Sequence, residues 1–191
     1  PCLSGQEHYA TEQRLQKSGL EFTILRDSWY ADVFAQLLLK PAIATGKLVM
    51  SVGDGLVAPV AKQDCADAAA SALLDPEKHA GAIYEITGPH VMSLSEMVAL
   101  ASEITGKAIK YVNVSHTKQQ AIFDSMGIKK ESEEGMKRET HDAWSSNEML
   151  SYEKAIKQGF FAICSRHVQF ITGRPAITLG QVIESNRQML V

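Results

Sequence analysis

Short apolar runs alternate with longer segments that carry helix signals, and this alternation limits the folds open to the chain. The runs FTILR (22–26) and AIYEITG (82–88) are short, apolar and rich in β-branched residues, so they predict strands buried on both faces. Longer segments follow them, such as the one in which Ser93 and Glu96 have capping-box spacing ahead of Gly106. Strands that alternate with helices predict an α/β fold with a partly parallel sheet.

Capping and turn residues predict the boundaries of several elements. Gly19 predicts the end of the first helix and Pro41 the end of the second. Asp64 is expected to cap the helix that it begins, and Asp54 followed by Gly55 predicts a hairpin turn. We therefore expect helices over 6–17, 31–39 and 64–75, a hairpin over 46–64, and a last helix capped by Thr178 and Gln181.

Composition excludes several classes of function. Hydrophobic residues make up 45% of the chain and charged residues 21%, which is typical of a globular domain. A net charge of −3, without long runs of Lys or Arg, argues against a nucleic-acid surface, and no apolar stretch approaches the ~20 residues of a membrane span. Three scattered cysteines without a CxxC pair predict free thiols in a reducing compartment, so we expect a cytoplasmic protein. The six histidines have no metal-ligand spacing, so no metal is predicted.

The fingerprint G-x-G-x-x-G, which binds dinucleotide phosphates in doubly wound folds, does not occur in this sequence. The only glycine-rich segment, GDGL (53–56), lies between two β runs and does not open a helix. We therefore interpret it as a hairpin turn and not as a phosphate-binding loop.

The segment RDSWY (26–30) places two large aromatic residues where the first strand ends and a helix begins. Residues just past the carboxyl end of a parallel strand lie on the ligand-binding edge of an α/β sheet. Trp29 and Tyr30 could therefore form a wall for a flat ring, with the Tyr30 hydroxyl beside it. Packing of both rings into the core is the alternative, and the residues alone leave the two interpretations open.

Two further groups of residues have more than one interpretation. His8 and Glu12 are four apart and share one helix face, where they could form a proton relay or an ordinary surface pair. The last third of the chain is rich in aromatic residues, which could fill the core or form a lid over a substrate pocket; they are Trp144, Phe160, Phe161 and Phe170.

Taken together, these segments resemble an NmrA-like atypical short-chain dehydrogenase/reductase, in the branch of the NAD(P)H:quinone oxidoreductases. The resemblance is carried by EHYATEQRLQKSGLEFTILRDSWY (7–30), GDGLVAPVAKQDCADAAASALL (53–74), GAIYEITGPHVMSLSEMVALASEITGKAIKYVNVS (81–115) and ITGRPAITLGQVIES (171–185). These pieces occur in the family's order and spacing. The segment from about 116 to 170 falls in the family's most variable region.

The resemblance implies the C-terminal part of a Rossmann-like doubly wound parallel sheet with a small α/β substrate-binding subdomain. Residues 1–45 would be a remnant of the dinucleotide-binding domain, and residues 46–191 would hold the remaining sheet elements and the substrate-binding, C-terminal subdomain. Pro1 would fall just after the family's fourth strand, so the half with the glycine fingerprint is expected to be absent from this chain. A sheet cut there would expose a strand edge and an apolar face, which predicts self-association.

The resemblance also implies a function, namely hydride transfer from NADPH to a quinone or a similar flat aromatic acceptor. The implied catalytic residues are His8, Glu12 and Tyr30, with His8 as the proton donor, and the implied cofactor-binding residues are Arg26, Asp27, Ser28 and Trp29. In the quinone-reductase branch the corresponding stretch is usually Arg-Asn-Gly-Trp-Tyr, so Asp27 and Ser28 depart from it. A carboxylate near phosphates is unfavourable, and a Cβ in place of glycine crowds the ring.

Those two departures and the missing fingerprint leave other functions open. One is a regulator that senses NADP, binds a partner protein and catalyses nothing. Another is a truncated member of the family that serves as an interaction module. A homo-oligomer and a regulatory protein partner are both compatible with the sequence.

Overall fold

The computed structural model describes residues 2–131 and 145–190. Within these ranges the strands pair two by two in three small sheets. The pairs β1–β4 and β2–β6 are parallel, whereas β3–β5 is antiparallel. The strands are β1 (Ile24–Asp27), β2 (Lys47–Met50), β3 (Leu56–Val57), β4 (Ile83–Ile86), β5 (Met92–Ser93) and β6 (Lys110–Asn113).

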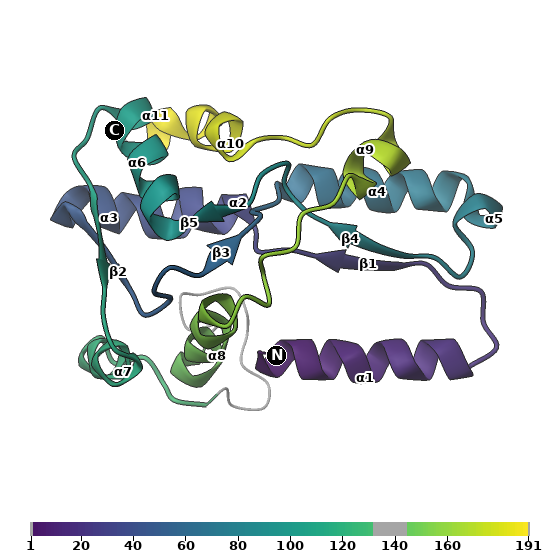
Figure 1. The fold of residues 1–191 in the computed structure, drawn as a ribbon, viewed down its shortest axis with the longest axis horizontal. Helices are drawn as coiled ribbons and strands as arrows, with labels where there is room; N and C mark the ends of the chain where they lie inside the picture. The colour runs from purple at the N-terminus through teal and green to yellow at the C-terminus, as the bar shows by residue number, and fades with distance from the viewer. Residues whose placement is uncertain (1, 132–144, 191) are drawn as a thin grey trace.

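Helices surround these strands and alternate with them along the chain (Figure 1). In that view β1 and β4 run between α1 on one side and α4 on the other. The helices of the first half are α1 (Leu3–Lys17), α2 (Ala31–Val33), the π-helix η1 (Phe34–Leu38), α3 (Leu39–Thr45), α4 (Lys62–Leu74) and α5 (Pro76–His79). Those of the second half are α6 (Leu94–Thr105), α7 (His116–Ser125), α8 (Ser146–Lys157), α9 (His167–Thr172), α10 (Leu179–Ser185) and α11 (Arg187–Leu190). The parallel strand pairs and the helices confirm the expected α/β class.

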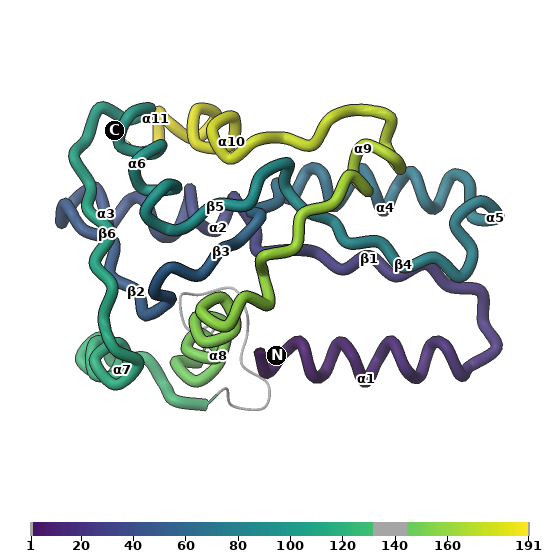
Figure 2. Tube along the Cα trace, in the orientation of Figure 1, coloured from purple at the N-terminus to yellow at the C-terminus, as the bar shows by residue number. Residues whose placement is uncertain are grey.

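Buried side chains form two cores. The smaller core lies around β4, α4 and α9 and contains Val60, Ala68, Tyr84, Ile86, Val168 and Ile171. The larger core gathers residues of α2, η1 and α3 with those of β2, α6 and α10, and its largest fully buried side chains include Phe34, Leu39, Leu94 and Met97. Figure 2 shows the C-terminal helices α10 and α11 beside α6. The end of the chain is therefore needed to close the larger core.

Several predicted boundaries are confirmed. Helix α1 ends at Lys17, and Gly19 has a left-handed φ of +74°. Ser93 and Glu96 form a complete capping box at the start of α6, and Thr178 and Gln181 form another at the start of α10. These are the positions at which a local hydrogen bond sets the boundary, so the sequence is sufficient to predict them.

The predicted end of the second helix at Pro41 is wrong. The helical segment that begins at Ala31 continues through Pro41 to Thr45, because a π-helical turn lies just before the proline. The Leu39 amide donates to the Phe34 carbonyl, five residues back. Such a wider turn changes the hydrogen-bond register ahead of a proline, which has no N–H of its own to donate.

The predicted hairpin over 46–64 is also wrong. Its two β runs pair with different partners, β2 with β6 and β3 with β5. The turn between them has a packing role, since a Cβ on Gly55 would lie 2.4 Å from the carbonyl oxygen of Ile156 in α8. The segment therefore connects two small sheets.

Asp64 does not cap α4, contrary to expectation. The N-cap is Ala61, and Asp64 lies in the first turn with a fully buried side chain. Its carboxylate accepts hydrogen bonds from the Arg174 guanidinium at 2.7 Å and the Ile177 amide at 2.8 Å. Asp64 therefore fastens α4 to the loop between α9 and α10.

Helix α1 is exposed along most of its length, and Glu12 is its only buried residue. Within the described residues β1 pairs with β4 alone, so its other edge carries no strand. The sequence predicted that such an edge is exposed, and its exposure stays a prediction. Self-association through it stays a prediction.

Candidate active site

The carboxyl ends of β1 and β4 meet at one edge of their sheet. Asp27 is in register with Ile86, and the Ser28 amide extends the pairing with a 2.9 Å hydrogen bond to the Ile86 carbonyl. Gly88, just beyond β4, crosses the chain at Pro59, and a Cβ on it would lie 2.0 Å from the Pro59 carbonyl oxygen. Only glycine permits this crossing, so the edge is tightly built where the two strands end.

A small hollow of about 100 Å³ opens at this edge. One wall is polar and comes from β1, β4 and the residues just beyond them, namely Arg26, Asp27, Ser28, Glu85 and Thr87. The other wall is apolar and comes from the segment after α8, namely Phe160, Phe161 and Ile163. A polar wall facing an aromatic wall suits a flat ring that carries polar substituents.

Arg26 is held by two carboxylates. Its Nε and Nη2 atoms donate to the two oxygens of Glu12 at 2.9 and 2.7 Å, and its Nη1 atom donates to Glu85 at 2.8 Å. These hydrogen bonds lower the pKa of the Glu12 carboxyl. Because Glu12 belongs to α1 and Glu85 to β4, Arg26 ties both elements to β1. We call Glu12, Arg26 and Glu85 the arginine clamp.

His8 lies one helical turn before Glu12 on the exposed part of α1. His8 does not line the hollow at the sheet edge. Both Glu12 oxygens accept from Arg26, and within the described residues no hydrogen bond joins Glu12 to His8. The predicted relay is therefore not formed through Glu12, while His8 stays a predicted proton donor.

Asp27 is exposed but lies in a crowded environment. Partial loss of hydration raises the pKa of its carboxyl, and hydrogen bonds from the Tyr30 hydroxyl, at 3.1 Å, and from the Cys65 thiol offset part of this rise. Burial raises the pKa of the Tyr30 phenol above its ordinary value as well, so Tyr30 keeps its proton at neutral pH. Lys62 lies over the Tyr30 ring at 5.7 Å.

Trp29 and Tyr30 pack against different cores. The partly buried Trp29 contacts the larger core and meets Phe34 edge-to-face at 6.2 Å, whereas Tyr30 packs against the smaller core. Neither residue lines the hollow, although Arg26, Asp27 and Ser28 do. The predicted roles of Trp29 and Tyr30 in a pocket wall therefore stay predictions.

The aromatic wall comes from a part of the sequence that matched no motif. Phe160 and Phe161 line the hollow, whereas the Phe170 ring packs near Tyr84, with the ring centroids 6.1 Å apart. Trp144 lies outside the described residues. The two adjacent phenylalanines were the only sequence feature that could have predicted this wall. Their position at the sheet edge depends on how α8 packs.

Two further findings concern cofactors and membranes. In the part of the chain that the structure describes, no three His, Cys, Asp or Glu side chains converge as a metal site would require. None of the helices in that part has the length and apolar character to cross a membrane.

Curated proteins related in sequence include two reductases and a protein named for differentiation. The chain is 32% identical over 129 residues to quinone oxidoreductase 2 of Escherichia coli, a match that spans 67% of this chain and 44% of that protein. It is 30% identical to prestalk A differentiation protein A of Dictyostelium discoideum, over 61% of this chain and 38% of that protein. It is 26% identical to the NAD(P)H azoreductase of Xenophilus azovorans, over 97% of this chain and 60% of that protein. No family model matches the chain.

The fold is also that of a known reductase. The crystal structure of the NADPH-dependent quinone oxidoreductase of Escherichia coli in complex with NADPH superposes with a TM-score of 0.81 at 25% identity, over 97% of this chain and 60% of that one. This likeness confirms the expected Rossmann-like α/β class. The chain spans less than two thirds of the length of each of these relatives.

Proposed function

Because the chain is related in sequence and fold to the NmrA-like quinone oxidoreductases, we propose that it forms part of an NAD(P)H-dependent reductase that acts on quinone-like acceptors. The single observation that carries this proposal is the hollow between polar and aromatic walls at the carboxyl edge of β1 and β4. In open α/β sheets this edge is where ligands bind.

The residues of the hollow fit one end of a nicotinamide dinucleotide. A volume of about 100 Å³ with Phe160 and Phe161 on one side and Ser28 and Thr87 on the other suits a ring with an amide substituent. The hollow does not fit the diphosphate, because it contains the Asp27 carboxylate and offers no glycine-rich turn at the start of a helix. Residues that hold the diphosphate would have to come from outside the hollow. When bound, the cofactor would supply the hydride.

The side chains around the hollow have separate roles in this proposal. Ser28 orients the ring, and the two phenylalanines keep water from its other face. The ionised Glu12 holds Arg26 and so orients α1. His8 on α1 gives a proton to the oxygen of the reduced acceptor, and Tyr30 keeps Asp27 in place through its hydroxyl.

The proposal extends the division expected from the sequence. Residues 1–45 would belong with the dinucleotide-binding part, and residues 46–191 would carry the remaining sheet elements and the acceptor site. Small aromatic or quinone acceptors are the proposed substrates and NADPH the proposed cofactor. A homo-oligomer and a cytoplasmic location, the latter expected from the three scattered cysteines, belong to the same proposal.

An assay of NADPH oxidation with a simple benzoquinone tests this function. The expected result is quinone-dependent oxidation by the native protein, reduced at least tenfold by His8→Ala and little changed by Tyr9→Ala, which alters a neighbouring exposed residue of the same helix. NADPH binding without turnover across several quinones would contradict the reductase.

One observation favours a second function. The Asp27 carboxylate lines the hollow and is hydrogen-bonded to Tyr30, which disfavours a nearby phosphate. A regulator that senses NADP without turning it over, or an interaction module that binds no dinucleotide, would tolerate this residue. Calorimetry separates these outcomes, since the regulator binds NADPH without turnover and the module shows no heat of binding.

A further inference from the structure

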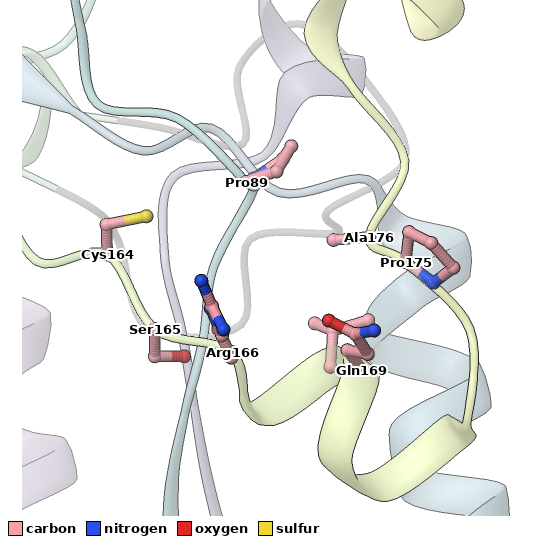
Figure 3. A pocket seen from close by; sticks show the side chains of 8 residues that line it. Pro89, Cys164, Ser165, Arg166, Gln169, Pro175 and Ala176 are labelled. Carbon is pink, nitrogen blue, oxygen red and sulfur yellow. The ribbon is translucent and has the colours of Figure 1, made fainter.

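A second and larger hollow lies on the other side of the segment that follows α8. It has a volume of about 290 Å³, and eight residues line it, namely Pro89, Cys164, Ser165, Arg166, Val168, Gln169, Pro175 and Ala176. Figure 3 shows Cys164, Ser165 and Arg166 on one side of the view and Gln169, Pro175 and Ala176 on the other, with Pro89 above Arg166. None of these residues lines the hollow at the sheet edge, so the two hollows are separate.

Arg166 gives this hollow a positive charge. It is the only charged residue among the eight that line the hollow. Among the described residues no hydrogen bond or ion pair engages its guanidinium, whereas Arg26 and Arg174 each bind two carboxylates. An arginine without a protein partner offers a planar set of donors that matches a carboxylate or a sulfonate.

The backbone that carries Arg166 is fixed from both sides. The Ser165 hydroxyl donates to the Glu85 carbonyl at 2.5 Å, and the Ser165 amide donates to the Thr87 hydroxyl at 3.0 Å. On the other side of Arg166, the Nδ1 atom of His167 accepts the Glu85 amide at 2.9 Å. Arg166 therefore projects from a segment fastened along β4, which lowers the entropy cost of presenting it to a ligand.

The remaining walls are mostly uncharged and apolar. Val168, Pro175, Pro89 and Ala176 offer hydrocarbon surface, and Gln169 adds an amide. The volume lies near the lower limit of pockets that bind small molecules, about 300 Å³. A dinucleotide is too large for this space, whereas one or two fused rings are not.

We propose that this hollow binds a small aromatic molecule that carries one carboxylate or sulfonate. The acid group pairs with Arg166, and the flat body lies against the apolar walls formed by Pro89, Val168 and Pro175. The site does not depend on the proposed reductase activity, because it shares no residue with the hollow at the sheet edge.

Titration of the protein with naphthalene sulfonate, followed by amide chemical shifts, tests the proposal. We expect the shifts to concentrate at residues 164–169 and 176, and a neutral naphthyl alcohol of the same size to bind at least fivefold more weakly. Equal binding of the alcohol, or shifts concentrated at residues 26–28 and 85–87, would overturn the proposal.

Two matched variants isolate the charge. Arg166→Gln removes the guanidinium from the hollow and is expected to weaken sulfonate binding at least fivefold. Arg14→Gln removes the same charge from the exposed face of α1 and is expected to leave binding within twofold. Because Arg166 is exposed, the variant should keep the folded amide spectrum. Unchanged affinity in Arg166→Gln would refute the site.

Discussion

The two parallel strand pairs of this protein are alike in length and direction, yet in the described residues a hollow opens where β1 ends, whereas a buried polar network fills the space where β2 ends. β1 with β4 and β2 with β6 are both four-residue pairs, and in each the chain beyond one strand adds a further backbone hydrogen bond. Where β1 ends, its last residue Asp27 and the following Ser28 line a hollow. Beyond β2, Ser51 is buried and has no access to a ligand.

The closed edge is filled by its own polar network. The Ser51 amide and hydroxyl both donate to Glu153 of α8, which is only 4% exposed. The Nδ1 atom of His116 lies 2.7 Å from the Ser51 hydroxyl, and its Nε2 atom lies 3.0 Å from the Leu150 carbonyl oxygen. Each polar group at this edge thus has a protein partner, as buried polar groups require.

The difference lies in what covers each edge. Helix α8 delivers Glu153 directly onto the end of β2, whereas the segment after α8 passes the end of β1 and leaves a space beside Phe160 and Phe161. A parallel strand followed by a polar residue is therefore insufficient to define a site. The element that packs over the end of the strand, here α8 or the segment after it, decides whether that end stabilises the fold or binds a ligand.

The largest loss of stability should come from removing the Glu153 side chain, which fills the space where β2 ends. Glu153→Ala leaves the Ser51 amide and hydroxyl without an acceptor and opens a cavity, so it should lower the free energy of unfolding by about 3 kcal/mol. Asp27→Ala removes an exposed carboxylate at the open edge and should change it by less than about 1 kcal/mol. Urea unfolding of the two variants measures both values. Equal losses would contradict the comparison.

The arginine clamp should have the next largest effect. Arg26→Gln leaves the buried Glu12 carboxylate without its cation, so α1 should open locally and lose about 1–2 kcal/mol of protection. Hydrogen exchange of the α1 amides reports this loss. Arg187→Gln, which breaks an exposed pair with Glu184 at 3.3 Å, is the control and should leave α1 unchanged. If both variants exchange alike, the clamp does not dock the helix.

A rise in pH should change the stability contributions of the two buried carboxyl groups, those of Glu153 and Glu12, in opposite directions. Burial raises the pKa of Glu153 above 4.5, so the part of its contribution to stability that depends on protonation is present at low pH and is lost as the pH rises through the folded-state pKa, in addition to the packing and hydrogen bonds that Glu153→Ala removes. Hydrogen bonds from Arg26 lower the pKa of Glu12, so its contribution is present above 4.5 and is lost as the pH falls.

Glutamine variants separate the two effects in unfolding curves measured between about pH 2.5 and pH 7, a range that reaches below the unfolded-state pKa of Glu12. Relative to the native chain, Glu153→Gln should become more stable as the pH rises, and Glu12→Gln should become less stable. The Glu12→Gln difference at neutral pH should be smaller than that of Arg26→Gln, since Arg26→Gln also breaks the pair with Glu85 and leaves the Glu12 carboxylate without its cation. If the stabilities of the two glutamine variants, relative to the native chain, change with pH in the same direction, the causes assigned to the two pKa shifts are wrong.

Local signals in the sequence predicted part of this architecture. The capping boxes at Ser93 and Thr178 and the end of α1 near Gly19 depend on neighbouring residues, and all three were predicted. The hairpin over 46–64 was not correct, because β2 pairs with a strand about sixty residues further on, and no local pattern encodes that partner.

The candidate site was likewise predicted only in part. The position after a strand predicted a ring wall at Trp29 and Tyr30, and the resemblance implied that residues 26–29 bind the cofactor. Residues 26–28 line the hollow and residues 29 and 30 do not, while the cofactor-binding role stays a prediction. The role of Arg26 as a clamp depends on Glu85, which is distant in sequence, and the aromatic wall depends on the packing of α8. The sequence therefore did not predict the contacts between elements that lie far apart along the chain.

The smallest predicted effect tests whether the open edge can accept a dinucleotide. Asn and Gly in place of Asp27 and Ser28 restore the pattern of the quinone-reductase branch, removing one negative charge and one Cβ from the hollow. The charge alone is expected to be worth about 1 kcal/mol near a phosphate at a partly exposed site. Calorimetry with NADPH should therefore show affinity about fivefold higher for Asp27→Asn than for the native chain.

A matched change at the closed edge gives the control. Asp54→Asn removes the same charge from the turn beside β2 and should leave NADPH affinity unchanged, because Asp54 does not line the hollow where β1 ends. If Asp27→Asn binds no better than Asp54→Asn, the carboxylate of the open edge does not face the cofactor. The hollow between β1 and β4 would then serve a ligand without phosphates.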